Sequence, residues 1–454
     1  MISTRTAASR IIRVLRAHGH EAFLAGGCVR DLLLKRVPQD YDVATSAPPH
    51  QVERLFDQTV AVGKAFGVIR VRMEGREIEV ATFRTEGPYR DGRHPSSVRF
   101  ATAREDAARR DFTINGLFYD PVRRRVLDFV GGRPDLRRRT LRAIGDPAKR
   151  FCEDHLRLLR CVRFAAQLGF RIEPQTWKTL VALAPKIRAV SAERVRDELT
   201  KLLIALHAAA GARLLSRSGL MRWLLPEIEG MRGVAQPRAF HPEGDVFIHT
   251  LRVLGHLRHP SLRLAWAALL HDVGKPPTFE KTRAKGRIRI RFPRHTRVGT
   301  EVSERILRRL RFSNADREAI TQIVANHMTF KDVKSMRPAT LKRLFARPTF
   351  EEELALHRAD CLASHGKLGN VAFLRRRRRE LSEEEIRPAR LITGKDLIVM
   401  GLKPGPLFGK ILAAVEEAQL EGRLKTRQQA LDFVKRMILP RLFNNQNPLL
   451  SRLK

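Results

Sequence analysis

Two glycines followed by a pair of aspartates form the most chemically suggestive segment of the chain. Residues 26–44 read GGCVRDLLLKRVPQDYDVA, with Gly26 and Gly27 at the start of a predicted short helix and Asp40 and Asp42 after it. Glycine lets the backbone approach a phosphate closely, and the free N–H groups of a helix start favour an anion. Two carboxylates two apart on a predicted strand share a face, where a divalent cation would relieve their repulsion. The segment predicts a phosphate cradle beside a Mg²⁺ site, as nucleotidyl transfer requires.

Either half of this segment has an ordinary explanation when it is taken alone. A glycine pair is common in turns, and acidic residues are common in solvated loops. The ordered combination favours the chemical interpretation, because the apolar run Ala22–Ala25 before it predicts a buried strand.

A second chemical signal lies downstream. The run LAWAALL, which predicts a buried helix, ends in the pair His271 and Asp272. A desolvated imidazole and carboxylate at the end of such a helix would bind a divalent metal.

The chain carries a large excess of positive charge. Its 454 residues include 87 Lys and Arg against 48 Asp and Glu, a formal net charge of +39. Such an excess predicts nucleic acid as the partner, although a basic bias of the source proteome would explain part of it. Three Tyr and three Trp offer little aromatic surface for stacking bases. This scarcity favours recognition of structured RNA through its backbone and shape.

Cysteine usage and the N-terminal residues indicate the compartment. The four cysteines are scattered without a C-x-x-C pair, which excludes a zinc ribbon or a disulfide framework and suits a reducing cytosol. The first residues predict a basic amphipathic helix without the apolar centre of a signal peptide, and no apolar run approaches membrane-spanning length. We therefore expect a cytoplasmic protein with no membrane partner, either a monomer or a homodimer.

The elements that must position these residues change character along the chain. Residues up to about 135 alternate helix and strand, with a β-hairpin predicted around Glu74–Gly75. From about residue 140, apolar residues recur at helical spacing, with a break near Pro174. The predicted fold class is α+β, a head with a mixed sheet followed by a mostly helical remainder. The expected divisions are 1–140, 141–235, 236–370, and a charged linker with a helical tail at 371–454.

Five motifs follow one another between residues 20 and 205. They are GGCVRD…DYDVAT (26–45), RRDFTINGLFYD (109–120), LDFVGGRPDL (127–136), EDHLRLLRCVRFAAQLGF (153–170) and SAERVRDELTKLL (191–203). In this order they resemble the metal-binding, ribose-sensing, hinge, base-recognition and supporting segments of the class II tRNA nucleotidyltransferase and poly(A) polymerase family, the CCA-adding enzymes. Two departures, Gly116 and His155, remove no group that the chemistry needs. The resemblance implies a polymerase-β-like nucleotidyltransferase head and a helical neck for nucleotide recognition and RNA binding.

The resemblance also implies roles for individual residues. Asp40 and Asp42 would hold Mg²⁺, and Glu79 is a candidate third carboxylate, for which a solvent-facing strand position is an equal explanation. The predicted nucleotide-binding residues are Gly26, Gly27, Arg30, Arg110, Asp111, Asn115, Asp154, Arg157, Arg160 and Arg163.

Within that set, three functions are expected. The ribose would be read by Arg110, Asp111 and Asn115, although Asp111 could also cap the helix that follows it. The base edge would be read by Asp154 and Arg157, and the triphosphate would pair with Arg160 and Arg163. The three-residue spacing of Asp154 and these arginines predicts one helix face, which a salt-bridged surface stripe would also explain.

The downstream residues are similar to a second known set. His249 (FIHT), His271 and Asp272 (LLHDVGKP) and Asp360 (HRAD) resemble the metal ligands of the HD phosphohydrolase superfamily, and His295 and His327 match its second metal. An imidazole-rich site prefers Ni²⁺, Mn²⁺ or Co²⁺ over Mg²⁺, and Lys275 could hold a substrate phosphate; a scaffold without activity is the alternative.

The leading functional hypothesis is addition of CCA, or part of it, to tRNA 3′ ends from CTP and ATP with Mg²⁺. The alternatives are a poly(A) polymerase, a split CC-adding or A-adding enzyme, and an HD phosphohydrolase with an RNA-binding role.

Overall fold

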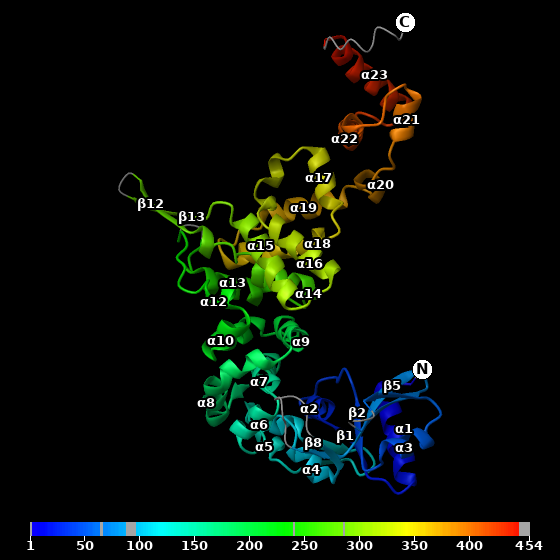
Figure 1. Ribbon diagram of the computed structural model, residues 1–454, viewed down its shortest axis with the longest axis vertical. Helices are drawn as coiled ribbons and strands as arrows, with labels where there is room; N and C mark the ends of the chain where they lie inside the picture. Colours follow the sequence, from blue (N-terminus) through cyan, green and yellow to red (C-terminus); the bar gives the residue numbers. More distant parts are fainter. Residues whose placement is uncertain (1, 64–66, 88–96, 239–240, 285–286, 445–454) are drawn as a thin grey trace.

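The computed structural model describes residues 2–63, 67–87, 97–238, 241–284 and 287–444. The described chain is elongated and bent, with the sheet-containing head at one end and the C-terminal helices at the other (Figure 1). The α+β fold class predicted from the sequence is confirmed, because a mixed sheet occupies the head and helices make up most of the remainder.

The head is built on a seven-stranded sheet in the order β3-β4-β5-β2-β1-β8-β9. Strands β2 and β5 pair in parallel and the other neighbours are antiparallel. The strands are β1 (Ala22–Ala25), β2 (Asp42–Thr45), β3 (Thr59–Gly63), β4 (Val68–Met73), β5 (Arg76–Thr82), β8 (Leu117–Asp120) and β9 (Arg125–Asp128). The predicted hairpin is β4–β5, which turns at Glu74 and Gly75, both with positive φ.

Helices and one short ribbon complete the head. The helices are α1 (Thr4–Ala17), α2 (Gly27–Leu33), α3 (Pro49–Leu55), α4 (Ala103–Ala108), a 3-10 turn (Thr113–Asn115) and α5 (Gly132–Arg137), and the ribbon pairs β6 (Arg84–Glu86) with β7 (Val98–Phe100). Helix α1 is amphipathic and packs Ile11, Ile12 and Leu15 into the head core.

Asp40 is not on a strand, contrary to the prediction. Strand β2 begins at Asp42 because its partner β1 ends at Ala25, which pairs with Asp42. The next residue, Gly26, has φ +74° and turns the chain away, so no backbone remains for residue 40 to pair with. Asp40 lies in the loop that enters β2.

After the head the chain is almost wholly helical, as the change of period predicted. The elements are β10 (Thr140–Leu141), α6 (Pro147–Glu153), α7 (Leu156–Leu168), β11 (Arg171–Ile172), α8 (Pro174–Leu183), α9 (Ala192–Leu203), α10 (Ala208–Arg217), α11 (Leu220–Leu224) and α12 (Pro226–Glu229). Next come α13 (Val246–His256), α14 (Leu262–Leu270), β12 (Glu280–Ala284), β13 (Arg287–Arg291), α15 (His295–Arg309), α16 (Asn314–Asn326), α17 (Pro338–Phe345), α18 (Phe350–Ala363) and α19 (Gly369–Arg379). The last are α20 (Glu383–Ile386), α21 (Gly394–Val399), α22 (Pro406–Leu420) and α23 (Arg427–Asn444), with 3-10 turns at 184–189, 276–278 and 329–335.

The hydrophobic core is divided unevenly along this length. One cluster of buried side chains runs from Phe112 to Ala363, so the end of the head and most of the helices up to Ala363 share a continuous core. Smaller clusters lie within 330–386 and within 392–434. The domain boundaries expected from the sequence remain predictions.

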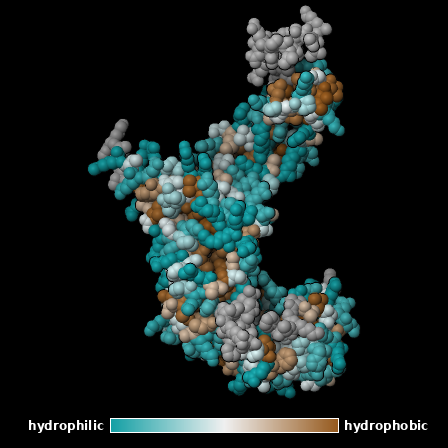
Figure 2. Space-filling model, viewed as in Figure 1, coloured by the Kyte–Doolittle hydropathy of each residue, from teal (hydrophilic) through white to brown (hydrophobic). Residues whose placement is uncertain are grey.

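Hydrophilic residues dominate the visible face, including the outer parts of the head (Figure 2). Gly116 has no room for a larger side chain, since a Cβ there would lie 2.7 Å from Val130 Cγ2. Among the described residues, no helix is both long enough and apolar enough to span a bilayer.

Candidate functional sites

The predicted transferase residues converge on one open cavity of about 850 Å³ between the head and helix α7. Its walls come from the end of β1, the start of β2, the 109–115 segment, α7 and α9. The lining includes all the predicted residues except Glu79: Gly26, Gly27, Arg30, Asp40, Asp42, Arg110, Asp111, Asn115, Asp154, Arg157, Arg160 and Arg163.

Asp40 and Asp42 form the acidic corner of this cavity. Asp42 is exposed to solvent as a whole residue. The surrounding protein nevertheless desolvates its carboxylate, and this effect, with the added repulsion from Glu79, raises its pKa to about 6. Glu79 lies on the adjacent strand β5, one residue before Val80, which pairs with Val43. Its side chain is half exposed and lies 3.3 Å from Arg70. A carboxylate whose ionised form is disfavoured by its acidic neighbours is where a bound divalent cation is most stabilising. The donor set therefore fits Mg²⁺.

The glycine turn is held against the head by two arginines. Gly26 is at positive φ, which disfavours any side chain, and a Cβ there would lie 2.9 Å from the Arg110 guanidinium, which would have to shift. Arg110 donates to Asp106 at 2.9 Å. Arg30 is buried and donates to Asn115 Oδ1 at 2.8 Å. This network fixes the backbone at the cavity floor.

Asp111 links the ribose motif to helix α7. Its Oδ1 accepts from the Phe112 N–H and from the Asn115 amide, and its Oδ2 accepts from Arg160 at 2.6 Å. Burial alone would raise its pKa, but the Arg160 guanidinium and the Asn115 amide lower it to about 2. Asp111 is therefore a buried anion that orients Arg160. It also stands at the start of a helical turn, where it accepts a main-chain N–H.

Helix α7 presents three arginines to the cavity, each held by a carboxylate. Arg157 donates to Glu153 at 2.6 Å and to the main-chain carbonyls of Arg150 and Arg109. Arg163 is buried and donates to Glu198 of α9. Buried guanidinium groups held by carboxylates have little freedom left to lose when a phosphate arrives.

Asp154 does not share the face of α7, contrary to the prediction. It is the C-terminal cap of α6, in extended conformation (φ −141°, ψ 107°), and α7 begins two residues later at Leu156. The break between the two helices turns its side chain toward α9, where Arg194 donates to Oδ2 at 2.7 Å. Asp154 and Arg157 still line the same cavity.

Sequence reasoning missed Arg194, which lines the cavity, and two carboxylates, Glu153 and Glu198, that pair with its arginines. Arg194 and Glu198 lie in the SAERVRDELTKLL motif, where the resemblance suggested only support, and Glu153 is the first residue of the base-recognition motif. The regular spacing of Arg194 and Glu198 on α9 was the available signal, since residues four apart face the same way.

The downstream candidates gather at the C-terminal end of α14. His249 comes from α13, His271 and Asp272 follow α14, His295 begins α15, His327 follows α16, and Asp360 lies on α18. The ring centroids of His249 and His271, of His271 and His327, and of His295 and His327 are 5.4–5.5 Å apart. Asp272 lies among the four histidines.

Three of these imidazoles have the geometry of metal ligands. The Nδ1 atoms of His271, His295 and His327 lie 2.9, 3.0 and 2.7 Å from main-chain carbonyl oxygens. Their Nε2 atoms are buried; those of His295 and His327 make no hydrogen bond within the described chain, and that of His271 lies 3.2 Å from Asp272 Oδ2. Burial lowers the pKa of His327 to about 4, so its ring is neutral, as a ligand must be. Orphaned Nε2 atoms beside a buried carboxylate fit a transition metal.

His249 sits among carboxylates instead. Its Nε2 lies 2.9 Å from Asp360 Oδ1, and its Nδ1 lies 2.7 Å from Glu243 Oε1. Burial alone would lower its pKa, but Asp360 and Glu243 raise it to about 9, so these carboxylates favour a cation here, either a proton on the ring or a metal ion in its place. A cavity of about 560 Å³ adjoins this cluster, and Lys275, which lies 2.7 Å from Asp272 Oδ2, is in its wall.

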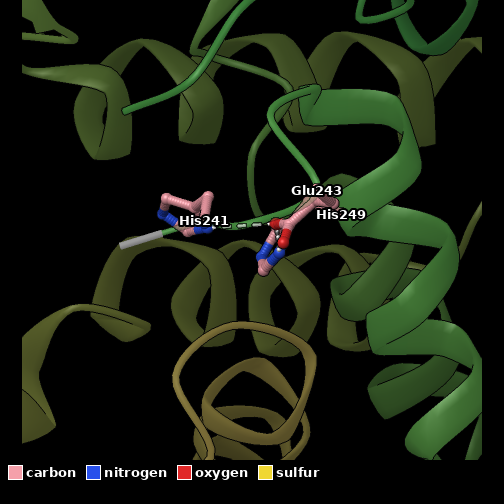
Figure 3. A group of neighbouring side chains, drawn as sticks. All are labelled: His241, Glu243 and His249. Atoms are coloured by element: carbon pink, nitrogen blue, oxygen red, sulfur yellow. Dashed lines mark hydrogen bonds and ion pairs between the residues drawn. The ribbon is translucent and has the colours of Figure 1, made fainter. Parts of the chain in front are cut away.

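His241, Glu243 and Gln236 were not predicted. They lie in the 229–244 segment, which reads as a Pro- and Gly-rich loop, yet the loop folds back onto His249 (Figure 3). The signal that could have found His241 and Glu243 is the HPEGD run (241–245), which ends only four residues before His249.

The comparisons with known proteins fit this geometry. The sequence model of the Poly A polymerase head domain matches residues 22–142, and that of the probable RNA and SrmB-binding site of polymerase A matches 169–231. The HD domain model matches 246–364. The fold and the acidic cavity thus define a nucleotidyltransferase of the poly(A) polymerase class, joined to an HD domain.

The relatives narrow this class to one family. The CCA-adding enzyme of Enterococcus faecalis is 32% identical over 426 residues, 93% of this chain and 94% of that protein. The CCA-adding enzyme of Geobacillus stearothermophilus is 44% identical over 268 residues, 58% of this chain and 62% of that protein. The chain belongs to the family of CCA-adding enzymes.

Solved structures agree with this assignment. The Bacillus stearothermophilus CCA-adding enzyme in complex with CTP has a TM-score of 0.77 and 29% identity, covering 98% of this chain and 100% of that one. The Thermotoga maritima CCA-adding enzyme complexed with tRNA is 18% identical with a TM-score of 0.59, over 95% of each chain, and shares the fold.

Proposed function

We propose that this protein adds the nucleotides of CTP and ATP to the 3′ end of tRNA without a nucleic-acid template. The observation that carries the proposal is the single cavity with an acidic corner on the sheet and anchored arginines on α7. The fit to full-length CCA-adding enzymes supports the same activity.

In this proposal the acidic corner holds the metal. Asp40 and Asp42 would bind Mg²⁺, and Glu79, whose charge acts on Asp42, is the candidate third carboxylate. When bound, Mg²⁺ would lower the pKa of the attacking 3′-hydroxyl and offset charge on the triphosphate. The residues beside it position the nucleotide: Gly26 and Gly27 keep the floor open, and Arg30 lies against Asn115 where a ribose would be read.

The wall formed by α7 would select and hold the nucleotide. Arg160 and Arg163 supply positive charge for the triphosphate, and Asp111 and Glu198 keep them oriented. Asp154 offers acceptor oxygens and Arg157 donor N–H groups on the same side of the cavity. An acceptor and a donor in fixed positions discriminate bases by hydrogen-bond pattern and so replace a template.

The direct test uses tRNA transcripts that end at the discriminator base, at -C and at -CC. Each is incubated with Mg²⁺ and CTP, ATP or both, and the 3′ ends are sequenced. We expect CCA to be completed and extension to stop there. Runs of A from ATP alone would indicate a poly(A) polymerase, and arrest at -CC or extension of -CC only would indicate a split enzyme. In the same assay Asp42→Ala should abolish addition while tRNA binding is retained.

A second function is favoured by the orphaned Nε2 atoms of the histidine cluster. We propose that the HD site binds Ni²⁺, Mn²⁺ or Co²⁺ and hydrolyses a phosphomonoester or a 2′,3′-cyclic phosphate. When bound, such a metal would supply an activated water. Lys275 lines the adjoining cavity and would hold the substrate phosphate. Hydrolysis of both substrate types is measured with each metal in turn, and no metal uptake with no hydrolysis would make this region a scaffold.

A further inference from the structure

Glu243 distinguishes His249 from the other histidines of the HD site. The Nδ1 atoms of His271, His295 and His327 face main-chain carbonyls, whereas Nδ1 of His249 faces the carboxylate of Glu243 at 2.7 Å. Both side chains are fully buried. Glu243 precedes the matched HD residues 246–364 and belongs to the loop that leads into α13.

Three contacts fix the Glu243 carboxylate in place. Oε1 lies 2.7 Å from His249 Nδ1 and 3.3 Å from His241 Nδ1, and Oε2 accepts from Arg252 at 3.2 Å. Figure 3 shows the Glu243 carboxylate beside the two imidazoles, whose ring centroids lie 4.6 Å apart. Gly244, at positive φ, directly follows it and donates its N–H to the carbonyl of His241, which closes the loop.

These contacts also exclude the simplest alternative, a cation held by His241, Glu243 and His249 themselves. The three groups lie close enough to suggest one. Nδ1 of His249 is already at hydrogen-bond distance from Oε1, and the Arg252 guanidinium occupies the other oxygen. A further cation would have to displace one of these groups. The free side of His249 is Nε2, which faces Asp360 at 2.9 Å. That separation suits two ligands of one ion at metal–ligand distances of about 2.0–2.2 Å.

We propose that Glu243 is a positioning residue of the HD metal site, which fixes His249 as the Nδ1–H tautomer and directs its Nε2 lone pair toward the metal. A carboxylate on Nδ1 increases the basicity of the imidazole more than a carbonyl does. The metal position that includes His249, His271, Asp272 and Asp360 is therefore tighter than the position formed by Asp272, His295 and His327. The inference rests on the proposed HD function.

The test compares Co²⁺ binding by the full-length protein and by Glu243→Gln, which keeps the side-chain volume. Both are stripped with chelator and titrated with Co²⁺, and affinity, stoichiometry and the visible d–d absorption are recorded. We expect the affinity of the tighter position to fall about 10–100-fold and its absorption bands to change. The weaker position keeps its affinity. Glu301→Gln is the matched control, because Glu301 is an exposed carboxylate on α15.

Each outcome has one meaning. Thermal unfolding and nucleotide addition are measured as independent reports of folding. A loss of stability with unchanged Co²⁺ affinity and absorption would overturn the inference, because Glu243 would then be only a loop contact. Loss of one whole Co²⁺ equivalent would overturn it by making Glu243 a ligand. Wild-type protein that binds no Co²⁺ would overturn the proposed HD function itself. Binding by the wild type with an unchanged Glu243→Gln variant overturns the inference alone.

Discussion

At the scale of single residues, the nucleotide cavity consists of arginines whose directions are set by acidic partners. Arg160 is held by Asp111, Arg163 by Glu198, and Arg157 by Glu153. A guanidinium with some N–H groups already bonded still has others to offer, and their directions are fixed. The cavity is therefore organised before a nucleotide enters.

Base selection should depend on the acceptor Asp154 and the donor Arg157 at the N-terminal end of α7. We expect Asp154→Ala and Arg157→Ala each to raise incorporation of UTP and GTP relative to CTP and ATP by about tenfold or more, because one good bidentate pair contributes about 1–3 kcal/mol of discrimination. Misincorporation is measured with all four nucleotides on tRNA ending in -C.

Arg171→Ala is the matched control for base selection, since Arg171 is exposed just beyond α7 and outside the cavity lining. Unchanged misincorporation in both Asp154→Ala and Arg157→Ala would contradict base reading at this wall.

At the scale of elements, α9 holds α7 in position through one buried anion. Glu198 is 4% exposed and lies against Arg163, with Arg160 at 3.7 Å. Helix α7 also buries its apolar face in the long core cluster, so its arginines can point only into the cavity. A change in α9 therefore reaches the nucleotide site through this ion pair.

Removing that anion should destabilise the helix pair. In Glu198→Gln the Arg163 charge stays buried without its partner, and breaking a buried pair in this way costs about 3–5 kcal/mol. We expect a lower midpoint of urea unfolding, followed by circular dichroism, and weaker triphosphate binding. Glu193→Gln, on the exposed side of the same helix, should change stability by no more than about 1 kcal/mol. Equal effects from both variants would refute a special role for Glu198.

At the scale of the whole molecule, charge and shape combine. The chain carries +39 and extends from the head to the tail helices without folding back into a compact body (Figure 1). The five arginines of 375–379 lie at the end of α19, mostly exposed, as a solvated face requires. A long basic body suits a long polyanion.

Binding of tRNA should therefore be strongly salt-dependent. Neutralised phosphates release counterions, so the affinity falls with salt, by about 10³–10⁵ between 50 and 200 mM for 6–10 phosphate contacts. We expect the tRNA affinity, measured by fluorescence anisotropy, to fall at least tenfold over this range. The unfolding temperature of the protein without tRNA is the control and should stay nearly constant. A flat affinity would indicate that the excess charge is compositional bias.

The two candidate sites should operate separately, because they lie in different parts of the fold and use different ligands. The cavity on the head is carboxylate-based and favours Mg²⁺, whereas the HD cluster is imidazole-rich and favours Ni²⁺, Mn²⁺ or Co²⁺. Asp272→Ala should abolish hydrolysis and spare nucleotide addition, and Asp42→Ala should do the reverse. Loss of both activities in either variant, with the fold intact by circular dichroism, would contradict this separation.

The sequence by itself determined the class of elements and most of the residues that meet in each site. Glycines, paired aspartates and histidines carry their chemistry in their residue types, and the changes of hydrophobic period mark the elements. Only the tertiary structure decided their partners. Arg194 meets Asp154 across 40 residues, and Glu243 meets His249 because a loop folds back onto α13. Such pairings depend on how the chain packs, since burial makes an unpaired charge costly and selects the partner within reach.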